Sequence, residues 1–102
     1  MKVVIVGTGE VGSHLSQVLS DAGHDVTVVE VDPDRAAHID EEHNVRVIQG
    51  SGSSAAILKE AIAAGCDQFI AMTSQDEINL IACSLARVLG AKTVISRIHD
   101  PT

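Results

Sequence analysis

Aromatic residues are almost absent from this sequence, because Phe69 is the only one and neither tryptophan nor tyrosine occurs. Proteins that bind single-stranded nucleic acid stack the bases on aromatic side chains, so that mode of binding is excluded. Hydrophobic residues still make up 45% of the 102 residues. We therefore expect one folded domain whose core consists of Val, Ile, Leu and Ala.

Basic residues are also scarce. Seven Lys and Arg stand against fourteen Asp and Glu, which gives a net charge of −7. The acids concentrate between Asp21 and Glu42, a stretch in which Arg35 is the only base. Nucleic acids and anionic membrane surfaces both require clustered Lys and Arg. The charge pattern therefore excludes these two classes of partner.

Long apolar runs and cysteine pairs are missing as well. No apolar stretch approaches the roughly 18 residues of a membrane helix, and because residues 1–6 lead directly into a strand we expect no signal peptide. Cys66 and Cys83 form no C-x-x-C pair, and the histidine spacing suggests no zinc site. We expect a cytoplasmic protein with two reduced thiols and no direct membrane insertion.

Apolar runs and helical patterns alternate along the whole chain. The runs at 2–6, 25–30, 45–49, 68–73 and 93–98 predict five buried strands. Four helices are expected between them, beginning near Glu10, at Pro33 after the N-cap Asp32, after Ser53 or Ser54, and after Ser74. Ser74 and Glu77 match a capping box. Predicted apolar helix faces comprise Val11, Leu15, Val18, Leu19 and Ala22 in the first helix, and Ile78, Ile81, Ala82, Leu85, Val88 and Leu89 in the last.

This order of elements predicts the fold class. Strands separated by helices lie parallel and are joined by right-handed crossovers. Strands that are apolar on both faces need helices on both sides of the sheet. We therefore expect an α/β domain with a Rossmann-like, doubly wound parallel sheet in the order 3-2-1-4-5, spanning residues 1–102.

The segment Gly7-Thr8-Gly9-Glu10-Val11-Gly12 leaves the first strand and opens the first helix. In such a G-x-G-x-x-G turn the first glycine permits the bend, the second lets a phosphate approach the backbone, and the third allows close packing of the helix. The helix N-terminus then offers free N–H groups and the positive end of its dipole to an anion. The loop predicts a nucleotide site.

Glu30 ends the second strand, 18 residues after Gly12, near the spacing of about 20 expected for a ribose-binding acid. A carboxylate there would accept hydrogen bonds from both ribose hydroxyls and repel a 2′-phosphate, which favours NAD over NADP. Arg35, in the next helix, is the residue that could oppose this selectivity. Glu10, in the first turn of the first helix, disfavours the triphosphate of ATP. We expect NAD or NADH, with ADP or ATP as the second choice.

Two further segments end strands at the same edge of the sheet, where open α/β sheets bind ligands. Gly50-Ser51-Gly52 should flank the adenine, and Thr73-Ser74 should lie toward the nicotinamide half. Ser74 could equally serve only to cap the helix. Arg97, at the end of the last strand, could pair with a phosphate, pair with an acid on a partner subunit, or remain solvated.

Four segments together resemble the KTN, or RCK, domain, the nucleotide-binding regulatory domain of Trk and Ktr potassium-uptake systems. They are "VVIVGTGEVGSHLSQVLSDAGHDVTVVEVDPDR", "VIQGSGSSAAILKEAIAAG", "CDQFIAMTSQDEINLIACSLAR" and "KTVISRI". The most specific part runs from Thr73 to Asn79. The resemblance implies a non-catalytic cytoplasmic sensor that binds NAD, NADH or ATP/ADP, forms dimers and rings, and gates a potassium-translocating membrane subunit.

The resemblance also assigns site residues by position. Phosphate contacts are implied for Gly7, Gly9, Glu10 and Val11, and a ribose contact for Glu30. The adenosine would be surrounded by Val31, Asp32, Gly50, Ser51 and Gly52, and the second half of the ligand would face Thr73, Ser74 and Arg97. Ser51 departs from the family, which usually has an acid there, and this weakens any bond to the adenine amino group. The family also continues into a second lobe, so the chain is either a single-lobe subunit or a piece of a longer one.

Three other functions remain open from the residues alone. The cofactor domain of an NAD-dependent dehydrogenase would need an acid or base beside the nicotinamide. Of the five histidines only His99 lies near the correct edge. A cation could be collected by Asp76, Glu77 and Asp100, although the first two suit the helix dipole without one. A purely structural interaction module could use the stripe from Ile78 to Leu89.

Overall fold

The computed structural model describes residues 1–97 and confirms the predicted order of elements. The five strands are β1 (Lys2–Val6), β2 (Asp25–Glu30), β3 (Arg46–Gln49), β4 (Gln68–Ala71) and β5 (Thr93–Ser96), and the four helices are α1 (Glu10–Asp21), α2 (Pro33–Glu42), α3 (Ala55–Ile62) and α4 (Asp76–Val88). Strands β3, β4 and β5 are shorter than predicted. Ile98, assigned to the last strand, lies outside the described residues.

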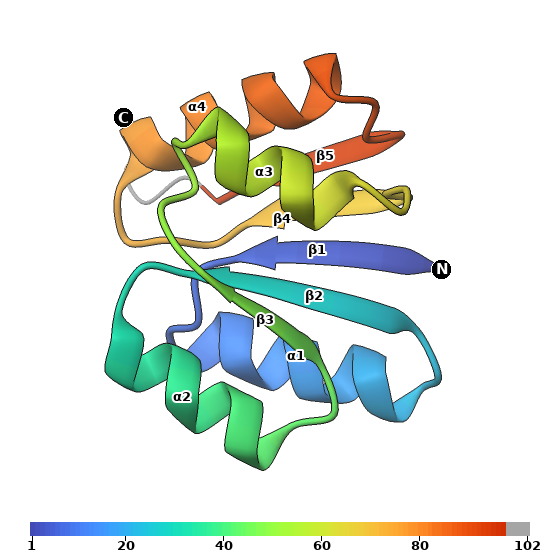
Figure 1. The fold of residues 1–102 in the computed structure, drawn as a ribbon, viewed down its shortest axis with the longest axis vertical. Coiled ribbons are helices and arrows are strands. Elements are labelled where there is room, and N and C mark those ends of the chain that lie inside the picture. Colours follow the sequence, from blue (N-terminus) through green and yellow to red (C-terminus); the bar gives the residue numbers. More distant parts are fainter. Residues whose placement is uncertain (98–102) are drawn as a thin grey trace.

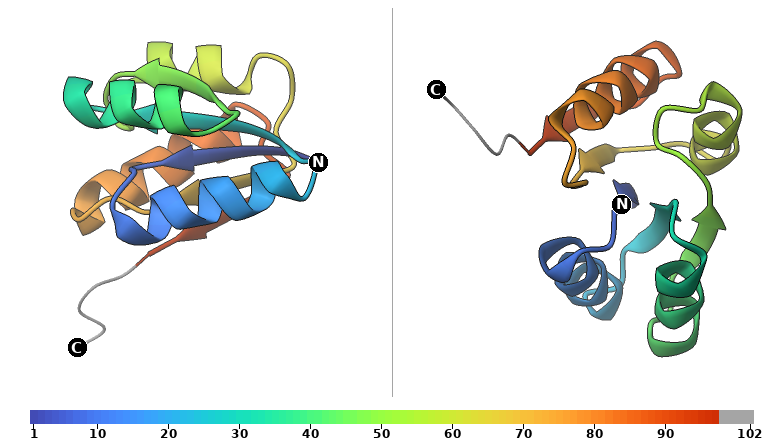
Figure 2. Two further views of the ribbon diagram at one scale, coloured as in Figure 1. Left: turned by 90° about the horizontal axis from the view of Figure 1, so that it is seen from below. Right: turned by 90° about the vertical axis from the view of Figure 1, so that its left-hand side faces the viewer.

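The strands form one parallel sheet in the order β3-β2-β1-β4-β5, as predicted. The central strand β1 pairs with β2 on one side and β4 on the other, with Val6 opposite Val29 and Ala71. Helices α3 and α4 cover the upper face of the sheet in Figure 1, and α1 and α2 cover the lower face. Figure 2 shows the same two helical layers from two further sides.

Alternate residues of each strand enter two separate hydrophobic cores. Val4 and Val6 of β1 pack with Phe69 in the core beneath α3 and α4. Val3 and Ile5 pack with Ile39 in the core beneath α1 and α2. This alternation explains why every central strand is apolar along its length, since neither face of the sheet is open to water.

The predicted apolar faces of α1 and α4 were wrong in part. In α1 the buried residues are Gly12 and Ser16, whereas Val11 and Val18 are about half exposed and Ala22 is exposed as well. A Cβ on Gly12 would lie 2.3 Å from the carbonyl oxygen of Gly7. The helix therefore comes so close to the loop that small residues face inward.

In α4 the buried residues are Asn79, Ala82, Cys83 and Ala86. Leu85 and Leu89 pack against this core as predicted. In contrast, Ile81 is 46% and Val88 85% exposed. The prediction was therefore correct for Ala82, Leu85 and Leu89 and wrong for Ile81 and Val88, and small residues again occupy much of the inner face.

The helix starts divide into two pairs. The Asp32 carboxylate accepts from the amides of Asp34 and Arg35 and caps α2, and the Ser54 hydroxyl accepts from the amide of Ile57 and caps α3. In contrast, the N-caps of α1 and α4, Gly9 and Gln75, make no side-chain capping bond. The capping box predicted at Ser74 was therefore wrong, since Ser74 lies one residue before the N-cap of α4.

Candidate functional site

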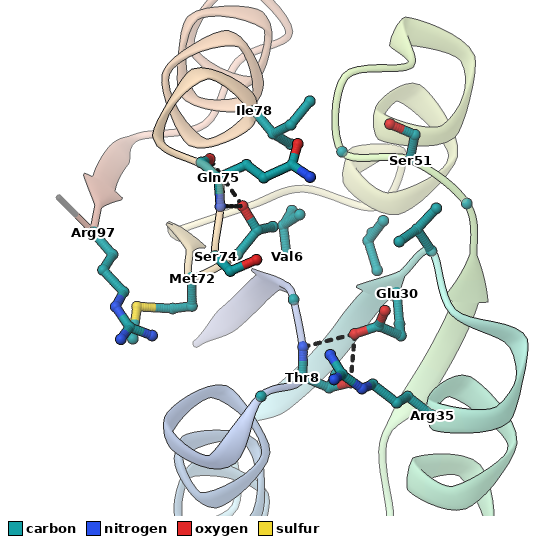
Figure 3. Close-up of a pocket in the computed structure, with 17 residues that line it drawn as sticks. Val6, Thr8, Glu30, Arg35, Ser51, Met72, Ser74, Gln75, Ile78 and Arg97 are labelled. Carbon is teal, nitrogen blue, oxygen red and sulfur yellow. Dashed lines mark hydrogen bonds between the residues drawn. The ribbon is translucent and has the colours of Figure 1, made fainter. Parts of the chain in front are cut away.

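A cavity of about 420 Å³ opens at the carboxyl ends of the strands, beside the point where the connections switch from one side of β1 to the other. This is the place where open α/β sheets bind ligands. Figure 3 shows the side chains that surround it. The lining residues are Val6, Gly7, Thr8, Gly9, Val29, Glu30, Val31, Arg35, Gly50, Ser51, Gly52, Met72, Thr73, Ser74, Gln75, Ile78 and Arg97.

Two walls face one another across this cavity. We call Thr8, Glu30, Val31, Arg35 and Gly50–Gly52 the Glu30 wall, and Met72, Thr73, Ser74, Gln75, Ile78 and Arg97 the Thr73 wall. Each wall begins where a strand ends, and backbone bonds continue the sheet into it. These bonds join Gly7 N to Val29 O at 2.9 Å, Gly50 N to Glu30 O at 2.9 Å, Met72 N to Val6 O at 2.8 Å and Arg97 N to Ala71 O at 3.0 Å.

The glycine loop lies between the two walls. Gly7 has φ +94°, which only glycine adopts readily, and a Cβ there would lie 3.0 Å from the amide nitrogen of Thr73. Gly9 has no heavy atom within 4 Å of the position a Cβ would take. The cradle at Gly9 is thus open, as close approach of a phosphate requires. With no capping side chain on Gly9, the first amides of α1 remain available to an anion.

Within the described residues 1–97, Glu30 carries the only carboxylate that lines the cavity, and it is 4% exposed. Its Oε1 accepts from the backbone N–H of Thr8 at 2.8 Å and from the Thr8 hydroxyl at 2.5 Å. Its Oε2 accepts from the backbone N–H of Asp32 at 2.9 Å. A carboxylate has about four acceptor positions. Three are used within the protein, so one position on Oε2 is left for a ligand hydroxyl rather than the two expected from the sequence.

The segment Gly50–Gly52 closes the Glu30 wall. A Cβ on Gly52 would lie 2.5 Å from a methyl carbon of Val6, so this backbone passes directly over β1. The Ser51 hydroxyl lies 2.8 Å from the Ser53 hydroxyl and accepts from the Ser53 amide at 3.1 Å. Ser51 therefore stabilises its own turn and brings no charge to the cavity.

The Thr73 wall is organised around Asn79, which is fully buried in α4. Asn79 Oδ1 accepts from the amide of Thr73 at 3.0 Å and lies 2.7 Å from the Thr73 hydroxyl. Asn79 Nδ2 donates to the carbonyl oxygens of Thr73 and Arg97, both at 3.1 Å. This residue was absent from the predicted site, although it ends the segment in which the resemblance is most specific, and it does not itself line the cavity.

Charge in the cavity differs from charge in the chain as a whole. The part of the lining that the structure describes contains two arginines and a single carboxylate, in a chain of net charge −7. Arg35 lies on the side of Thr8 and Glu30, and Arg97 on the opposite side beside Met72 (Figure 3). The lining therefore has a positive excess and suits an anionic ligand that spans the two sides.

Most of the predicted site residues meet at this cavity. Gly7, Thr8, Gly9, Glu30, Val31, Arg35, Gly50, Ser51, Gly52, Thr73, Ser74 and Arg97 line it. Glu10, Val11, Gly12 and Asp32 do not: Val11 faces solvent, Gly12 packs beneath the loop, and Asp32 caps α2. The residues missed were Val6, Val29, Met72, Gln75 and Ile78, whose apolar members were all assigned to the core.

Groups for other chemistry are not gathered at the cavity. None of its lining residues is a histidine or a cysteine, and His99 and Asp100 lie outside the described residues. Within residues 1–97 no three His, Cys, Asp or Glu side chains come close enough to hold a metal ion. In the same range no helix has the length and apolarity needed to cross a bilayer. Burial raises the pKa of the Cys66 and Cys83 thiols, which are unpaired.

The sequence model of the TrkA-N domain matches residues 3–102. Among curated relatives, the Trk system potassium uptake protein TrkA of Haemophilus influenzae is 39% identical over 101 residues, which cover 98% of this chain and 22% of that protein. A TrkA homolog of Pyrococcus abyssi is 36% identical over 102 residues, which cover 99% of this chain and 45% of that protein. The chain thus spans less than half the length of these relatives.

Solved structures share the fold at lower identity. The NAD(P)-binding domain of an exopolyphosphatase-related protein from Archaeoglobus fulgidus superposes with a TM-score of 0.83 at 18% identity, covering 97% of this chain and 74% of that one. The GsuK channel bound to NAD superposes with a TM-score of 0.72 at 24% identity, covering 92% of this chain and 21% of that one. GsuK bound to ADP gives 0.70 at 24% identity, with 93% and 31% covered.

Proposed function

Because the chain belongs to the TrkA-N domain family, we propose that it is the nucleotide-binding regulatory domain of a Trk-type potassium uptake system. Its ligand is an adenine dinucleotide, NAD or NADH, bound across the two walls of the cavity. The observation that carries this proposal is the uncapped start of α1 at Gly9, with the buried Glu30 carboxylate beside it. One feature binds phosphate and the other a ribose hydroxyl.

The order of ligands follows from charge and hydrogen bonding. A ribose hydroxyl donates to the remaining acceptor position of Glu30 Oε2, and a 2′-phosphate is repelled by the same carboxylate. Arg35 offsets part of this repulsion, since its side chain lines the same wall. We therefore expect NADP to bind more weakly than NAD, by roughly tenfold, which corresponds to about 1.4 kcal/mol.

ADP or ATP is the second candidate ligand. It would use the glycine loop, Glu30 and Gly50–Gly52 and leave most of the Thr73 wall without contact. The bound ligands named for the two GsuK structures, NAD and ADP, support keeping both candidates. The Thr73 wall favours the dinucleotide, because Arg97 brings a second cation on the side of the cavity opposite Arg35 (Figure 3).

A regulatory role is proposed in preference to catalysis. The curated relatives are named as potassium uptake proteins, and among residues 1–97 no histidine, cysteine or lysine lines the cavity to move a proton. We place the domain on the cytoplasmic side, in a dimer or larger ring, as a single-domain unit of a longer regulatory subunit. Ligand favours one arrangement of this assembly and so biases the potassium-translocating membrane subunit.

Calorimetric titration of NAD, NADH, NADP, ATP and ADP tests the ligand, with thermal unfolding as the second readout. A ligand present at 100 times its Kd should raise the free energy of unfolding by about 2.7 kcal/mol. We expect NAD or NADH to bind most tightly. Stabilisation by ATP alone would reverse the order of ligands, and turnover of an alcohol or hydroxy acid with NAD would restore the dehydrogenase reading.

A further inference from the structure

Asn79 is a neutral polar residue with no exposed surface, in the second turn of α4. A primary amide has two donor hydrogens and two acceptor positions on its oxygen. All four face a partner here: the Thr73 amide donates to Oδ1, and Nδ2 donates to the carbonyl oxygens of Thr73 and Arg97. The Thr73 hydroxyl lies 2.7 Å from Oδ1, closer than the 3.1 Å to its other acceptor, the Gln75 carbonyl oxygen. The helix thus holds a completely satisfied polar group where an apolar residue would serve packing alone.

The partners of Asn79 fix its orientation. The backbone N–H of Thr73 can only donate, so it must face Oδ1. The carbonyl oxygens of Thr73 and Arg97 can only accept, so they must face Nδ2. No residue without both a donor and an acceptor can replace it.

These four bonds join segments that are far apart in the sequence. Thr73 follows β4 and Arg97 follows β5, and both line the cavity. Arg97 is held from two sides, because its amide donates to the carbonyl of Ala71 while its carbonyl accepts from Asn79. The Glu30 wall is held separately, by the bonds from Thr8 and Asp32 to the Glu30 carboxylate.

We propose that Asn79 is a positioning residue for the second half of the dinucleotide. It sets Thr73 and the start of the Arg97 side chain at the distance that a ligand bridging the two walls requires. It leaves the adenosine half unaffected, because none of its bonds reaches the Glu30 wall. This inference rests on the proposed function and adds a separate requirement to it, namely that Asn79 controls the preference for a dinucleotide over a mononucleotide.

The test compares AMP with NADH by calorimetry in wild type and Asn79→Asp. The substitution keeps the acceptor for Thr73 but turns an oxygen toward two carbonyl oxygens. We expect the Kd for NADH to rise at least tenfold and the Kd for AMP to change less than twofold. Protonation lets the new carboxyl donate one hydrogen bond, so lowering the pH should recover part of the NADH affinity in this variant only.

Ser16→Ala is the matched control, because Ser16 is also fully buried in a helix but donates only to the carbonyl of Ser13. It should leave the ratio of the two Kd values unchanged. If Asn79→Asp does not fold, Asn79→Ser gives the same comparison, because it removes the amide without introducing a charge.

The outcomes are distinct. An equal loss of AMP and NADH affinity would show that Asn79 only supports the fold, and unchanged NADH binding would show no role at all; either result overturns the inference and leaves the proposed function standing. A wild-type protein that binds neither nucleotide overturns both.

Discussion

The two walls of the cavity each depend on one buried polar side chain, but the two side chains differ in chemistry. Glu30 is a carboxylate that only accepts, and its partners are backbone and hydroxyl groups of Thr8 and Asp32. Asn79 is an amide that accepts and donates, and it lies behind its wall rather than in it. Glu30 has one hydrogen-bond acceptor position left for a ligand, whereas Asn79 has no hydrogen-bonding position left. On the proposed function, the Glu30 wall selects the ligand, and the Thr73 wall is itself held in position by Asn79.

The largest effect is expected where both walls meet, at the glycine loop. In Gly12→Ala the added Cβ would lie 2.3 Å from the Gly7 carbonyl oxygen, so α1 must move away from the loop. We expect the free energy of unfolding to fall by about 1–3 kcal/mol and binding of AMP and NADH to be lost together. Urea unfolding and calorimetry measure the two effects.

Gly9→Ala is the control for that substitution. Its Cβ would meet no atom within 4 Å, and φ at Gly9 is −62°. The free energy of unfolding should change little, while the added methyl group narrows the space for a phosphate and lowers the affinity for both AMP and NADH. If Gly9→Ala bound AMP and NADH with unchanged affinity, the proposal that a phosphate binds at this loop would be contradicted.

Glu30→Gln tests the selective wall. The substitution keeps the shape but places an N–H₂ group against the N–H of either Thr8 or Asp32. We expect the affinities for AMP and NADH to fall alike, by roughly tenfold, which corresponds to about 1.4 kcal/mol. The difference in affinity between NAD and NADP should become smaller. Thr8→Val is the control, because it removes only the hydroxyl bond to Oε1. It should lower the free energy of unfolding by about 1 kcal/mol and leave the ribose position free.

The two arginines lie on different walls, so we expect substitution of each one to affect the binding of a different ligand. Arg97→Gln should weaken the binding of NADH several-fold and leave the affinity for AMP nearly unchanged, because Arg97 belongs to the Thr73 wall. Arg35→Gln should improve discrimination against NADP, since it removes the cation beside Glu30. Titrations at two salt concentrations check that both effects are electrostatic, because screening weakens them at higher ionic strength. Equal effects of Arg97→Gln on AMP and NADH would contradict the assignment.

The smallest effect is expected at the opposite edge of the sheet. Two groups hold the pKa of the Asp67 carboxyl below its usual value. The first is the Lys2 amide, which donates to Asp67 Oδ2 at 2.8 Å, and the second is Lys92, whose Nζ lies 3.3 Å from Asp67 Oδ1. A lowered folded pKa adds stability above the unfolded pKa of about 3.9 and loses it as the pH falls through the folded value. Asp67→Asn should therefore make acid unfolding less steep without changing nucleotide affinity. Circular dichroism between pH 2 and 7 checks this.

Much of this architecture could be predicted from local sequence. Apolar runs, the turn glycines and the capping residue Asp32 act within a few residues of themselves, so the strand order and most cavity residues followed from them. Glu30 could be placed because its spacing from Gly12 is a property of one βαβ unit.

The rest depends on contacts between distant segments. Asn79 could not be assigned from sequence, because its role requires the carbonyl of Arg97 at the end of β5. The capping box at Ser74 failed for a related reason: the chain after β4 folds around Asn79, and the Thr73 hydroxyl accepts from Gln75 N at 3.2 Å. The helix faces were misjudged because close approach to the sheet selects small residues such as Ser16 and Ala86.

The central claim is that one nucleotide bridges the two walls over the start of α1. Backbone amide chemical shifts of the wild-type protein, recorded by NMR during titration with AMP and with NADH, test it most directly. We expect AMP to shift the amides of Gly9, Val31 and Ser51, and NADH to shift these together with Ser74, Gln75 and Arg97. If NADH moved only the first group, or moved amides away from the cavity, a ligand bridging the walls would be contradicted.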